Sequence, residues 1–375
     1  MDLNECRKKI DEIDEKIVKL YEERMAVSEE VADYKLTNGM NVLDKKRERA
    51  KLDSVIALTH NEFNEKGIEE LYSHIMSISR KRQYDIMEEI GIRGRLSFMK
   101  VEKLDLSNAR IVYQGTEGAF SEEAVIQYFG KDCNRFHVDT FREAMSLIDE
   151  GLADFGVLPI ENSSAGIVTE NYDLLCQFEN YIVATQIIQI RHCLAAKRGA
   201  SIEDIKDVYS HPQAIMQSRE YLEQHMDIRI HDHLNTALAA SMVAESDDKS
   251  RGAICSERCA KMYGLDILEH DINFSSKNST KFIIVTNQKI FLEDAGRVSV
   301  CFEIPDRTGS LYHVLSLFYY NDINMSHIES RPIPSHPGEY RFFVDFDGNL
   351  ADASVKNVLH GLREETVNMK ILGNY

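Results

Sequence analysis

The sequence has no long run of apolar residues, and no stretch reaches the roughly 20 that a membrane-spanning helix needs. Residues 1–14 are charged and follow a helical pattern, so they are not expected to act as a secretory signal. The seven cysteines include no Cys-x-x-Cys pair and no regular spacing, which is typical of reduced thiols. Together these absences favour a cytoplasmic protein.

Basic residues are in the minority: 44 Lys and Arg face 62 Asp and Glu, for a net charge of −18. A protein this acidic is not expected to bind nucleic acid. If it binds an anion, it must gather its cations locally, so clusters of Arg and Lys mark candidate sites. With 375 residues, two or three domains are expected.

Residues 155–166 read Phe-Gly-Val-Leu-Pro-Ile-Glu-Asn-Ser-Ser-Ala-Gly. The apolar start predicts a buried strand, which Pro159 is expected to end because proline lacks an N–H. Glu161, Asn162 and Ser163 follow, and polar groups at a strand end are typical of a ligand site in an open α/β sheet. A helix start capped by Ser or Asn is the alternative, which this stretch taken alone favours.

Gly and Pro are absent from residues 1–38, which predict one long helix that ends at Gly39. Its apolar residues follow the three-four spacing of a helix-packing seam. They are Leu3, Cys6, Ile10, Ile13, Ile17, Leu20, Val27, Val31 and Tyr34. Arg24 interrupts this seam, and a buried charge needs a partner. A polar residue that sets the register, or an arginine that reaches out to solvent, is the alternative.

Lys35 follows Arg24 by about three helical turns, so the two cations share a face. Arg7 lies on a different face, roughly 25 Å away along the axis. If all three cations serve one site, Arg7 comes from a second subunit. A helix of roughly 50 Å is also too long for one small domain to cover, so an intertwined dimer is expected.

Two further helices are predicted, one from about residue 44 and one over 68–89. Each places polar residues within one turn of each other, and so on a shared face. These residues are Asp44, Arg47 and Glu48 on the second helix, and Ser79 and Gln83 on the third.

With these residues in place, residues 1 to about 90 resemble the all-helical chorismate mutase family. The resemblance implies a site built from Arg7, Arg24, Lys35, Asp44, Arg47, Glu48, Ser79 and Gln83. The substrate is a dicarboxylate that rearranges without proton transfer, so arginines suffice to hold its reactive conformation. Lys35 and Gln83 are expected to donate to the ether oxygen, where negative charge develops.

Residues 91–108, with Gly91 and Gly94, are predicted to be a linker. From residue 109 onward, short apolar runs alternate with helical patterns, which predicts an α/β domain. Thr140 and Glu143 form the capping box of a helix over 141–150. The expected strands are Arg110–Gln114, Asp154–Leu158, Ile182–Ile190, Asp207–Ser210, Ala253–Cys255 and Phe282–Thr286.

Three more polar segments follow predicted strands. The loop Gln114–Ser121 opens a helix and has the glycines of an anion-binding turn, or of a plain βα turn. Ser210–Gln213 with Gln217, and Asn278–Phe282, are the other two. They contain no Cys–His or Ser–His–Asp arrangement. His231 and His233 lack a further metal ligand, so no metal or cofactor is expected.

The order of these motifs resembles prephenate dehydratase over residues 109 to about 286. The resemblance implies two α/β lobes around a cleft, similar to periplasmic binding proteins. It implies catalysis by Thr280 and substrate binding by Glu161, Asn162, Ser163, Ser210 and Gln217. The departing hydroxyl needs a hydrogen-bond donor, which Thr280 supplies. Lys281 stands where the family has arginine, and lysine cannot form the two-pronged contact.

Residues 297–375 carry a βαββαβ pattern that resembles the ACT domain, a small-molecule sensor. The resemblance implies a phenylalanine site at Gly309, Ser310, Leu311, Glu329 and Ser330. A ferredoxin-like dimerisation domain is the alternative. The whole chain is thus predicted to be a bifunctional mutase–dehydratase that acts on chorismate and prephenate, is inhibited by L-phenylalanine and forms a homo-oligomer. An amino-acid sensor without catalysis and a helical scaffold are the rival hypotheses.

Overall fold

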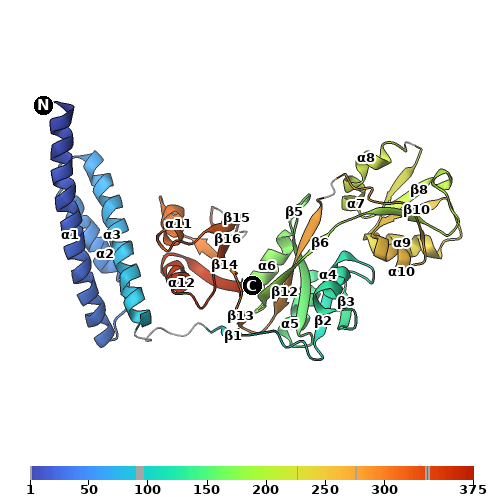
Figure 1. Ribbon diagram of the computed structural model, residues 1–375, viewed down its shortest axis with the longest axis horizontal. Helices are drawn as coiled ribbons and strands as arrows, with labels where there is room; N and C mark the ends of the chain where they lie inside the picture. The colour runs from blue at the N-terminus through green and yellow to red at the C-terminus, as the bar shows by residue number, and fades with distance from the viewer. Residues whose placement is uncertain (1, 90–96, 226, 275–276, 334–335, 337) are drawn as a thin grey trace.

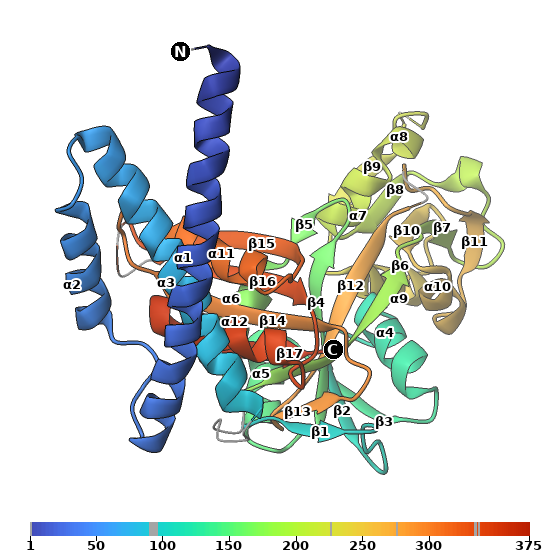
Figure 2. The same cartoon turned by 60° about the vertical axis from the view of Figure 1, so that its left-hand side comes forward.

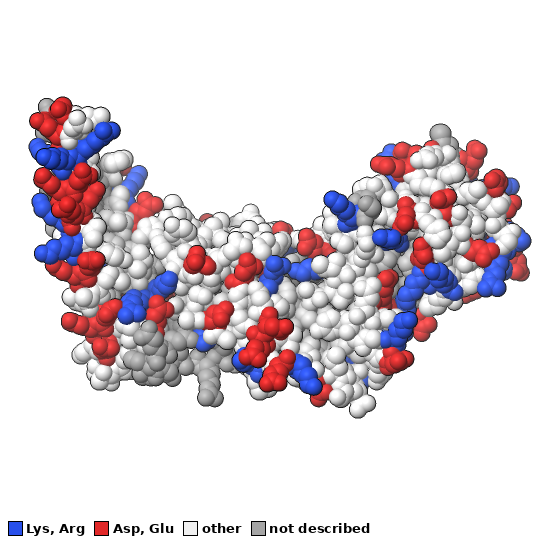
Figure 3. Space-filling view, in the orientation of Figure 1, with Lys and Arg blue, Asp and Glu red and all other residues white. Residues whose placement is uncertain are grey.

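The computed structural model describes residues 2–89, 97–225, 227–274, 277–333, 336 and 338–375. The chain forms three parts that Figure 1 shows in a row. The N-terminal helices lie at one end, the C-terminal segment in the middle, and the α/β region at the other end. Charged residues of both signs crowd the N-terminal helices in the view of Figure 3, while the middle of that face has fewer.

The N-terminal part consists of α1 (Leu3–Thr37), α2 (Lys45–Ile56) and α3 (Glu62–Glu89). Asp2 caps α1 in a capping box with Glu5, and Asp44 caps α2 by accepting from the Arg47 amide at 2.9 Å. The second helix therefore begins where the sequence predicts, whereas α3 begins six residues earlier than predicted. Gly39 follows α1 with φ +63°, in keeping with the predicted helix end.

The predicted seam of α1 is largely uncovered within one chain. Ser28 and Ala32 are the residues of α1 that the structure buries. The seam residues with the greatest exposure, between 40% and 65%, are Leu3, Ile10, Ile13, Ile17, Leu20, Val27, Val31 and Tyr34.

The α/β region has two lobes. The first contains β2 (Arg110–Gln114), β3 (Asn134–Val138), β4 (Phe155–Asn162), β5 (Gly166–Ile167), β6 (Tyr181–Gln189) and β12 (Ser279–Thr286). Its helices are α4 (Phe120–Phe129), α5 (Phe141–Asp149) and α6 (Thr169–Gln177). Every predicted strand is present within a few residues of its expected bounds, and Thr140 caps α5 as expected.

The second lobe is a five-stranded sheet of order β11-β7-β10-β8-β9 with helices around it. Its strands are β7 (Cys193–Ala196), β8 (Asp207–Ser210), β9 (Arg229–Asp232), β10 (Arg251–Cys255) and β11 (Asp266–Glu269). Its helices are η1 (Ile202–Asp204), α7 (Pro212–Gln217), α8 (Arg219–Leu222), α9 (Thr236–Glu245) and α10 (Glu257–Met262). The chain enters this lobe after β6 and returns before β12.

The prediction that Pro159 ends its strand is wrong, because β4 continues to Asn162. The pairing of β2 with β4 stops at Val157, so Pro159 needs no N–H on that side. On the other side, the register with β12 shifts between Lys281 and Phe282, which accommodates the proline. The alternative of a capped helix start is excluded as well, since β5 follows β4.

The C-terminal part has the predicted βαββαβ order. Its elements are β14 (Arg297–Ile304), α11 (Ser310–Tyr320), β15 (Met325–Pro332), β16 (Tyr340–Asp347), α12 (Ala353–Glu365) and β17 (Val367–Asn374). Its sheet joins that of the first lobe, because β17 lies beside β6 in one ten-stranded sheet of path β15-β16-β14-β17-β6-β12-β4-β2-β3. At the junction Gly373 lies opposite Ile182, and a Cβ on Gly373 would come within 2.1 Å of the Ile182 carbonyl oxygen.

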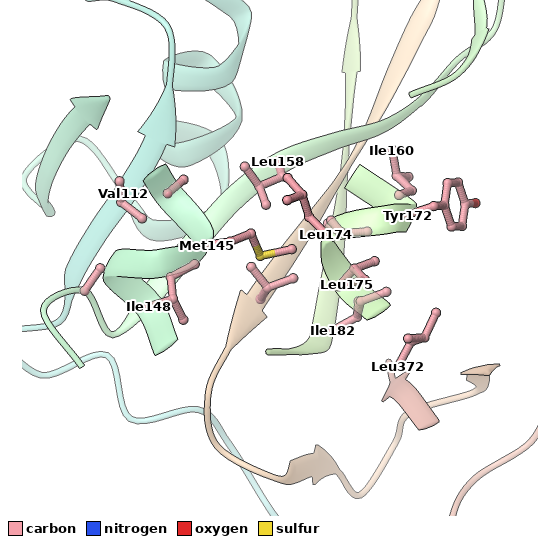
Figure 4. Packing of buried hydrophobic residues seen from close by; sticks show 14 of the residues in the cluster. Val112, Met145, Ile148, Leu158, Ile160, Tyr172, Leu174, Leu175, Ile182 and Leu372 are labelled. Carbon is pink, nitrogen blue, oxygen red and sulfur yellow. The ribbon is translucent and has the colours of Figure 1, made fainter. Parts of the chain in front are cut away.

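A hydrophobic core is shared across this junction. Met145, Leu158 and Leu174 of the first lobe pack in the same cluster as Phe343 and Leu372 of the C-terminal part. Figure 4 shows Leu372 approaching Ile182 and the helix that carries Tyr172. The first lobe and the C-terminal part therefore form one packed unit.

The predicted linker is partly structured. Its residues Met99–Val101 form β1, which pairs in parallel with β13 (Ile290–Leu292). Gly91 and Gly94 lie outside the described residues. None of the helices in the described ranges combines the length and apolar character needed to cross a bilayer.

Candidate functional site

The three N-terminal helices enclose a cavity of about 320 Å³, within the size range of small-ligand sites. Seven of the eight residues predicted for this site line it. They are Arg24, Lys35, Asp44, Arg47, Glu48, Ser79 and Gln83. These predicted residues supply three cations and two carboxylates, and Lys51 and Arg80 line the same volume, which suits a ligand with both carboxylate and hydroxyl groups.

Arg24 faces this cavity instead of packing in the seam. Its Nη1 donates to Ser79 Oγ at 2.9 Å, and Ser79 in turn donates to the carbonyl of Ile75. The contact fixes the guanidinium against α3 while leaving its remaining N–H groups for a ligand. This arrangement explains the charge in the seam without a register-setting role.

Lys35 reaches the same cavity from the last turn of α1, where its Nζ donates to the Val42 carbonyl oxygen. Burial lowers the pKa of Lys35, although the carboxylates of Glu48 and Asp44 oppose the shift. An ammonium with reduced hydration and nearby acids is well suited to stabilise negative charge on a bound ligand.

Gln83 is buried on α3, and its amide contacts Ser28 Oγ at 3.2 Å through Nε2. Its Oε1 has no hydrogen-bond partner among the described residues. The Ser28 hydroxyl can equally donate to Oε1 if the side-chain amide is rotated by about 180°, because the amide oxygen and nitrogen have nearly the same size and shape. The turned amide then presents its NH₂ group to the cavity.

Arg7 is the exception among the predicted mutase residues. It is exposed near the start of α1 and does not line the cavity. The exposed seam of α1 lies on the same helix.

In the α/β region, the predicted polar segments converge on Asn162 at the end of β4. Its Nδ2 donates to Thr280 Oγ1 at 2.8 Å and to Asn278 Oδ1 at 3.1 Å. Its Oδ1 accepts from the amides of Ser164 and Ala165, which forms the turn that leads to β5. The register explains the meeting, since Thr280 is the direct partner of Asn162 across β4 and β12.

Thr280 is 9% exposed, and its hydroxyl oxygen accepts a hydrogen bond from Asn162. The hydroxyl proton must therefore point elsewhere, and it meets no acceptor among the described residues. Thr280 is thus prepared to donate one hydrogen bond to a ligand.

Gln217 connects the second lobe to this cluster. Its Nε2 donates to Ser164 Oγ at 2.7 Å, and its Oε1 lies 2.9 Å from His192 Nε2. Because Oε1 accepts, His192 carries its proton on Nε2. Burial lowers the pKa of His192, which keeps the ring neutral. The lobes therefore meet through a chain of neutral hydrogen bonds beside Thr280, where Figure 2 shows β5 next to α7.

Other predicted residues lie nearby but make different contacts. Ser163 accepts from the Ser279 amide at 3.0 Å, at the rim of the cluster. Ser210 is fully buried and donates to the Ile254 carbonyl at 2.7 Å, inside the second lobe. Glu161 is exposed and lies opposite Lys281. The structure thus joins Asn162, Thr280 and Gln217, but not Ser210 or Glu161.

Lys281 contacts the C-terminal part. Its Nζ lies 5.5 Å from the centre of the Tyr375 ring. Burial lowers the pKa of Lys281, and the nearby carboxylate of Asp345 opposes this shift. The lysine therefore contacts a different set of groups from Thr280, its neighbour in the strand.

The glycine loop opens α4 as predicted, but one of its amides is already used. The Gly118 N–H donates to Glu122 Oε2 at 2.7 Å. Burial disfavours the charge on Glu122, but the Gly118 amide and the Arg258 guanidinium outweigh it and keep its pKa below the usual range. Arg258 belongs to α10, so Glu122 ties the loop to the second lobe.

Sequence reasoning missed Ser164, His192 and the role of Asn278 as an acceptor. Buried Asn278 Nδ2 and Thr116 Oγ1 have no partner among the described residues. Of the two histidines that the sequence analysis considered, His231 places its Nε2 2.7 Å from Asp207 Oδ1.

The predicted effector segments lie at two places in the C-terminal part. Gly309 precedes α11 with φ +82°, a conformation that disfavours other residues, and Ser310 and Leu311 open the helix. Glu329 and Ser330 lie in β15, an edge strand that Figures 1 and 2 both show beside α11.

Comparison with known proteins finds two families that match separate stretches of the chain. The family chorismate mutase type II matches residues 6–84, and the family prephenate dehydratase matches residues 111–290. A bifunctional chorismate mutase/prephenate dehydratase of Aquifex aeolicus is 30% identical over 100% of this chain and 98% of its own. The chain belongs to this bifunctional family. It is an enzyme that rearranges chorismate to prephenate and converts prephenate to phenylpyruvate.

Two further similarities support this membership. The bifunctional enzyme of Escherichia coli K12 is 30% identical over 98% of this chain and 95% of its own. A prephenate dehydratase from Arthrobacter aurescens, solved in complex with L-Phe, is 31% identical with a TM-score of 0.66. That structure covers 71% of this chain and 89% of its own.

Proposed function

We propose that the two reactions occur in separate sites, with chorismate bound among the N-terminal helices (residues 1–90) and prephenate beside Thr280 (residues 109–286). The observation that carries this proposal is the convergence of seven predicted residues on one cavity, far along the chain from the Asn162–Thr280 pair. Purified protein given chorismate should form phenylpyruvate. Formation of prephenate alone, or of neither product, would contradict it.

In the mutase cavity, Arg24 and Arg47 hold the carboxylates of chorismate in the reactive conformation. The substrate also has a hydroxyl group, which donates hydrogen bonds to the carboxylates of Asp44 and Glu48. Lys35 and Gln83 donate to the ether oxygen as its bond to carbon breaks. No proton changes place, so rate acceleration comes from conformation and electrostatics.

In the dehydratase site, the substrate loses carbon dioxide and hydroxide while its ring becomes aromatic. The electron pair of the broken C–CO₂ bond enters the ring, and the departing oxygen leaves with its own pair. Thr280 donates its hydroxyl proton in a hydrogen bond to that oxygen, while Asn162 fixes Thr280. Gln217 of the second lobe donates to Ser164 of the first and so closes the site across the two lobes, in the manner of a two-lobed binding protein.

The C-terminal part (residues 297–375) is proposed to be an ACT domain that binds L-phenylalanine at Gly309–Leu311 and Glu329–Ser330. Two contacts support a link to the dehydratase. The sheet is continuous from β15 to β12, and Arg331, next to Ser330, donates to the Thr169 carbonyl and pairs with Asp173 of α6. A ligand that favours one arrangement of this domain therefore shifts the lobe as well.

L-Phenylalanine is expected to bind the full-length protein and to lower the dehydratase rate. Coupling of this type typically changes affinity by about 5- to 150-fold, and prephenate should weaken phenylalanine binding by the same factor. The variant Gly309→Ala should weaken binding, because alanine is strained at φ +82°. Calorimetric titration and dehydratase assays measure both effects.

The matched control is Gly130→Ala, which introduces alanine at φ +92° in open space away from the effector segments. It should bind phenylalanine like the native protein. Full-length variants are preferable to a truncation near Thr286, since Phe343 and Leu372 belong to the core of the first lobe. Equal binding by both variants, or a dehydratase indifferent to phenylalanine, would contradict the assignment.

We also propose that the protein works as a homo-oligomer in the cytoplasm, with dimerisation through α1. The exposed apolar seam of α1 needs a cover, and Arg7 does not line the cavity that the helices of its own chain form. A second α1 antiparallel to the first covers the seam and brings its Arg7 to the cavity. All seven cysteines are free thiols, which is consistent with a reducing compartment.

A heterodimer with Arg7→Ala in one copy and Arg24→Ala in the other should retain about half of the mutase activity. One of its two sites then has both arginines, while the other has neither. Co-expression with two affinity tags isolates this species. Both homodimers should be inactive as mutases; an inactive heterodimer would place Arg7 in the site of its own chain, and an active Arg7→Ala homodimer would exclude Arg7 altogether.

A further inference from the structure

The third mutase helix, α3, packs directly on the C-terminal domain. His74 lies against α11, where its Nε2 contacts the Tyr312 hydroxyl at 2.8 Å. Further along α3, the Tyr84 hydroxyl donates to Glu364 of α12, and its ring stacks on His360 with centroids 5.0 Å apart. Figure 2 shows α3 lying across both helices. The mutase site and the C-terminal domain are therefore neighbours as well as parts of one chain.

Arg80 lies at the centre of this contact and bridges its two sides. Its Nη1 donates to Glu48 Oε2, a predicted substrate-binding group of the mutase site. Its Nη2 lies 3.6 Å from Glu365 Oε1 at the end of α12. One guanidinium thus joins a mutase carboxylate to a carboxylate of the C-terminal domain.

Arg80 and Glu48 also form the wall between two cavities. Both line the mutase cavity of about 320 Å³, and both line a second cavity of about 170 Å³ between the domains. The second cavity is bounded on its far side by His313 of α11 and Glu365 of α12. A displacement of either C-terminal helix therefore acts on the back of the wall that faces chorismate.

The side chain of Arg80 is 13% exposed, and those of Glu48 and Glu365 are 24% and 31% exposed. These three partly buried charges are expected to stay paired, because a partly buried ion that loses its partner is destabilised. Glu48 has a second cation within electrostatic range, Lys35. If Arg80 moves away from Glu48, Glu48 is free to pair with Lys35 and to withdraw the ammonium from the ether oxygen.

We infer that Arg80 is a positioning residue of the mutase, and that Glu365 of the C-terminal domain holds Arg80 in the geometry that aims Glu48 at the substrate. The inference rests on the proposed role of Glu48 in binding chorismate. It adds that the C-terminal domain sets the mutase rate through a direct contact, independently of its continuous sheet with the dehydratase.

The test uses full-length variants assayed separately on chorismate and on prephenate. Arg80→Ala should lower the mutase kcat by about 10- to 100-fold, the effect expected of a displaced active-site group. Glu365→Gln should lower it by roughly 2- to 5-fold, as expected for a partly exposed ion pair. Arg80→Lys should fall between native and alanine, since lysine keeps the charge but cannot bridge two carboxylates as arginine does. KM should change less than kcat in each case, and the dehydratase rate should not change.

The double variant Arg80→Ala with Glu365→Gln distinguishes a link through Arg80 from a general loosening of the interface. If Glu365 acts through Arg80, its replacement should have no further effect once Arg80 is gone. The matched control is Glu29→Gln, which removes a 2.7 Å pair between α1 and Arg82 of α3 on a side away from both cavities. It should leave mutase kinetics unchanged.

Several outcomes would overturn the inference. One is a native mutase rate in Glu365→Gln. Another is an additive effect in the double variant, and a third is an equal loss of mutase and dehydratase activity. Glu48→Gln separates this failure from that of the proposed function. If Glu48→Gln has a native mutase rate, the role of Glu48 itself is wrong, whereas a defective Glu48→Gln with a native Glu365→Gln removes only the link to the C-terminal domain.

Discussion

Replacing Thr280 with alanine is expected to slow the conversion of prephenate by at least about 100-fold, the usual effect of removing a transition-state donor. The Thr280 hydroxyl accepts a hydrogen bond from Asn162 and so has its own proton available for the departing oxygen. Substrate affinity should change less, because this bond strengthens as the oxygen leaves. Chorismate should still be consumed, and the reaction should stop at prephenate.

Two variants of the same strand serve as controls. Thr280→Ser keeps the hydroxyl and should retain most of the activity. Thr286→Val removes a hydroxyl from the far end of β12, away from Asn162, and should leave turnover intact. A native dehydratase rate in Thr280→Ala would rule out the role of this residue.

Replacing Arg24 with alanine is expected to lower mutase activity by at least about 100-fold, since two charge-assisted hydrogen bonds to a substrate carboxylate are lost. The dehydratase should be spared, because Arg24 lines the mutase cavity and donates to Ser79 of the same helical part. Prephenate supplied directly should still yield phenylpyruvate. Initial rates on each substrate, measured on one preparation, give both answers.

Arg82→Ala is the suitable comparison, since Arg82 pairs with Glu29 across the same two helices but does not line the cavity. It removes equal charge and volume, and should retain mutase activity. If Arg24→Ala unfolds the N-terminal helices, or keeps the native mutase rate, the assignment of Arg24 is wrong.

The sequence predicts the mutase cavity well because its residues lie on regular helices. Three-four spacing relates Arg24 to Lys35 and Ser79 to Gln83 without knowledge of the tertiary structure. What spacing does not supply is the partner across an interface. Arg80 shows no special feature in the sequence, and its importance appears once Glu48 and Glu365 are found on either side of it.

The dehydratase site was harder to predict, because its members meet through strand register. A polar residue after a strand indicates an edge of a sheet, but not which edge or which face. Ser210 and Gln217 illustrate the difference. Ser210 ends β8 and Gln217 ends the helix that follows, yet Ser210 turns into its own lobe while Gln217 crosses to Ser164. Pro159 is a further example, because β4 can contain a proline there only since its pairing with β2 ends at Val157.

The junction between β6 and β17 also orders events on the ribosome. β6 is synthesised long before β17, so one edge of the first lobe has no partner while the intervening chain is made. An unpaired edge of apolar strand is a template for association between nascent chains. Until Gly373 emerges to lie against Ile182, neighbouring chains on one messenger are expected to compete for that edge.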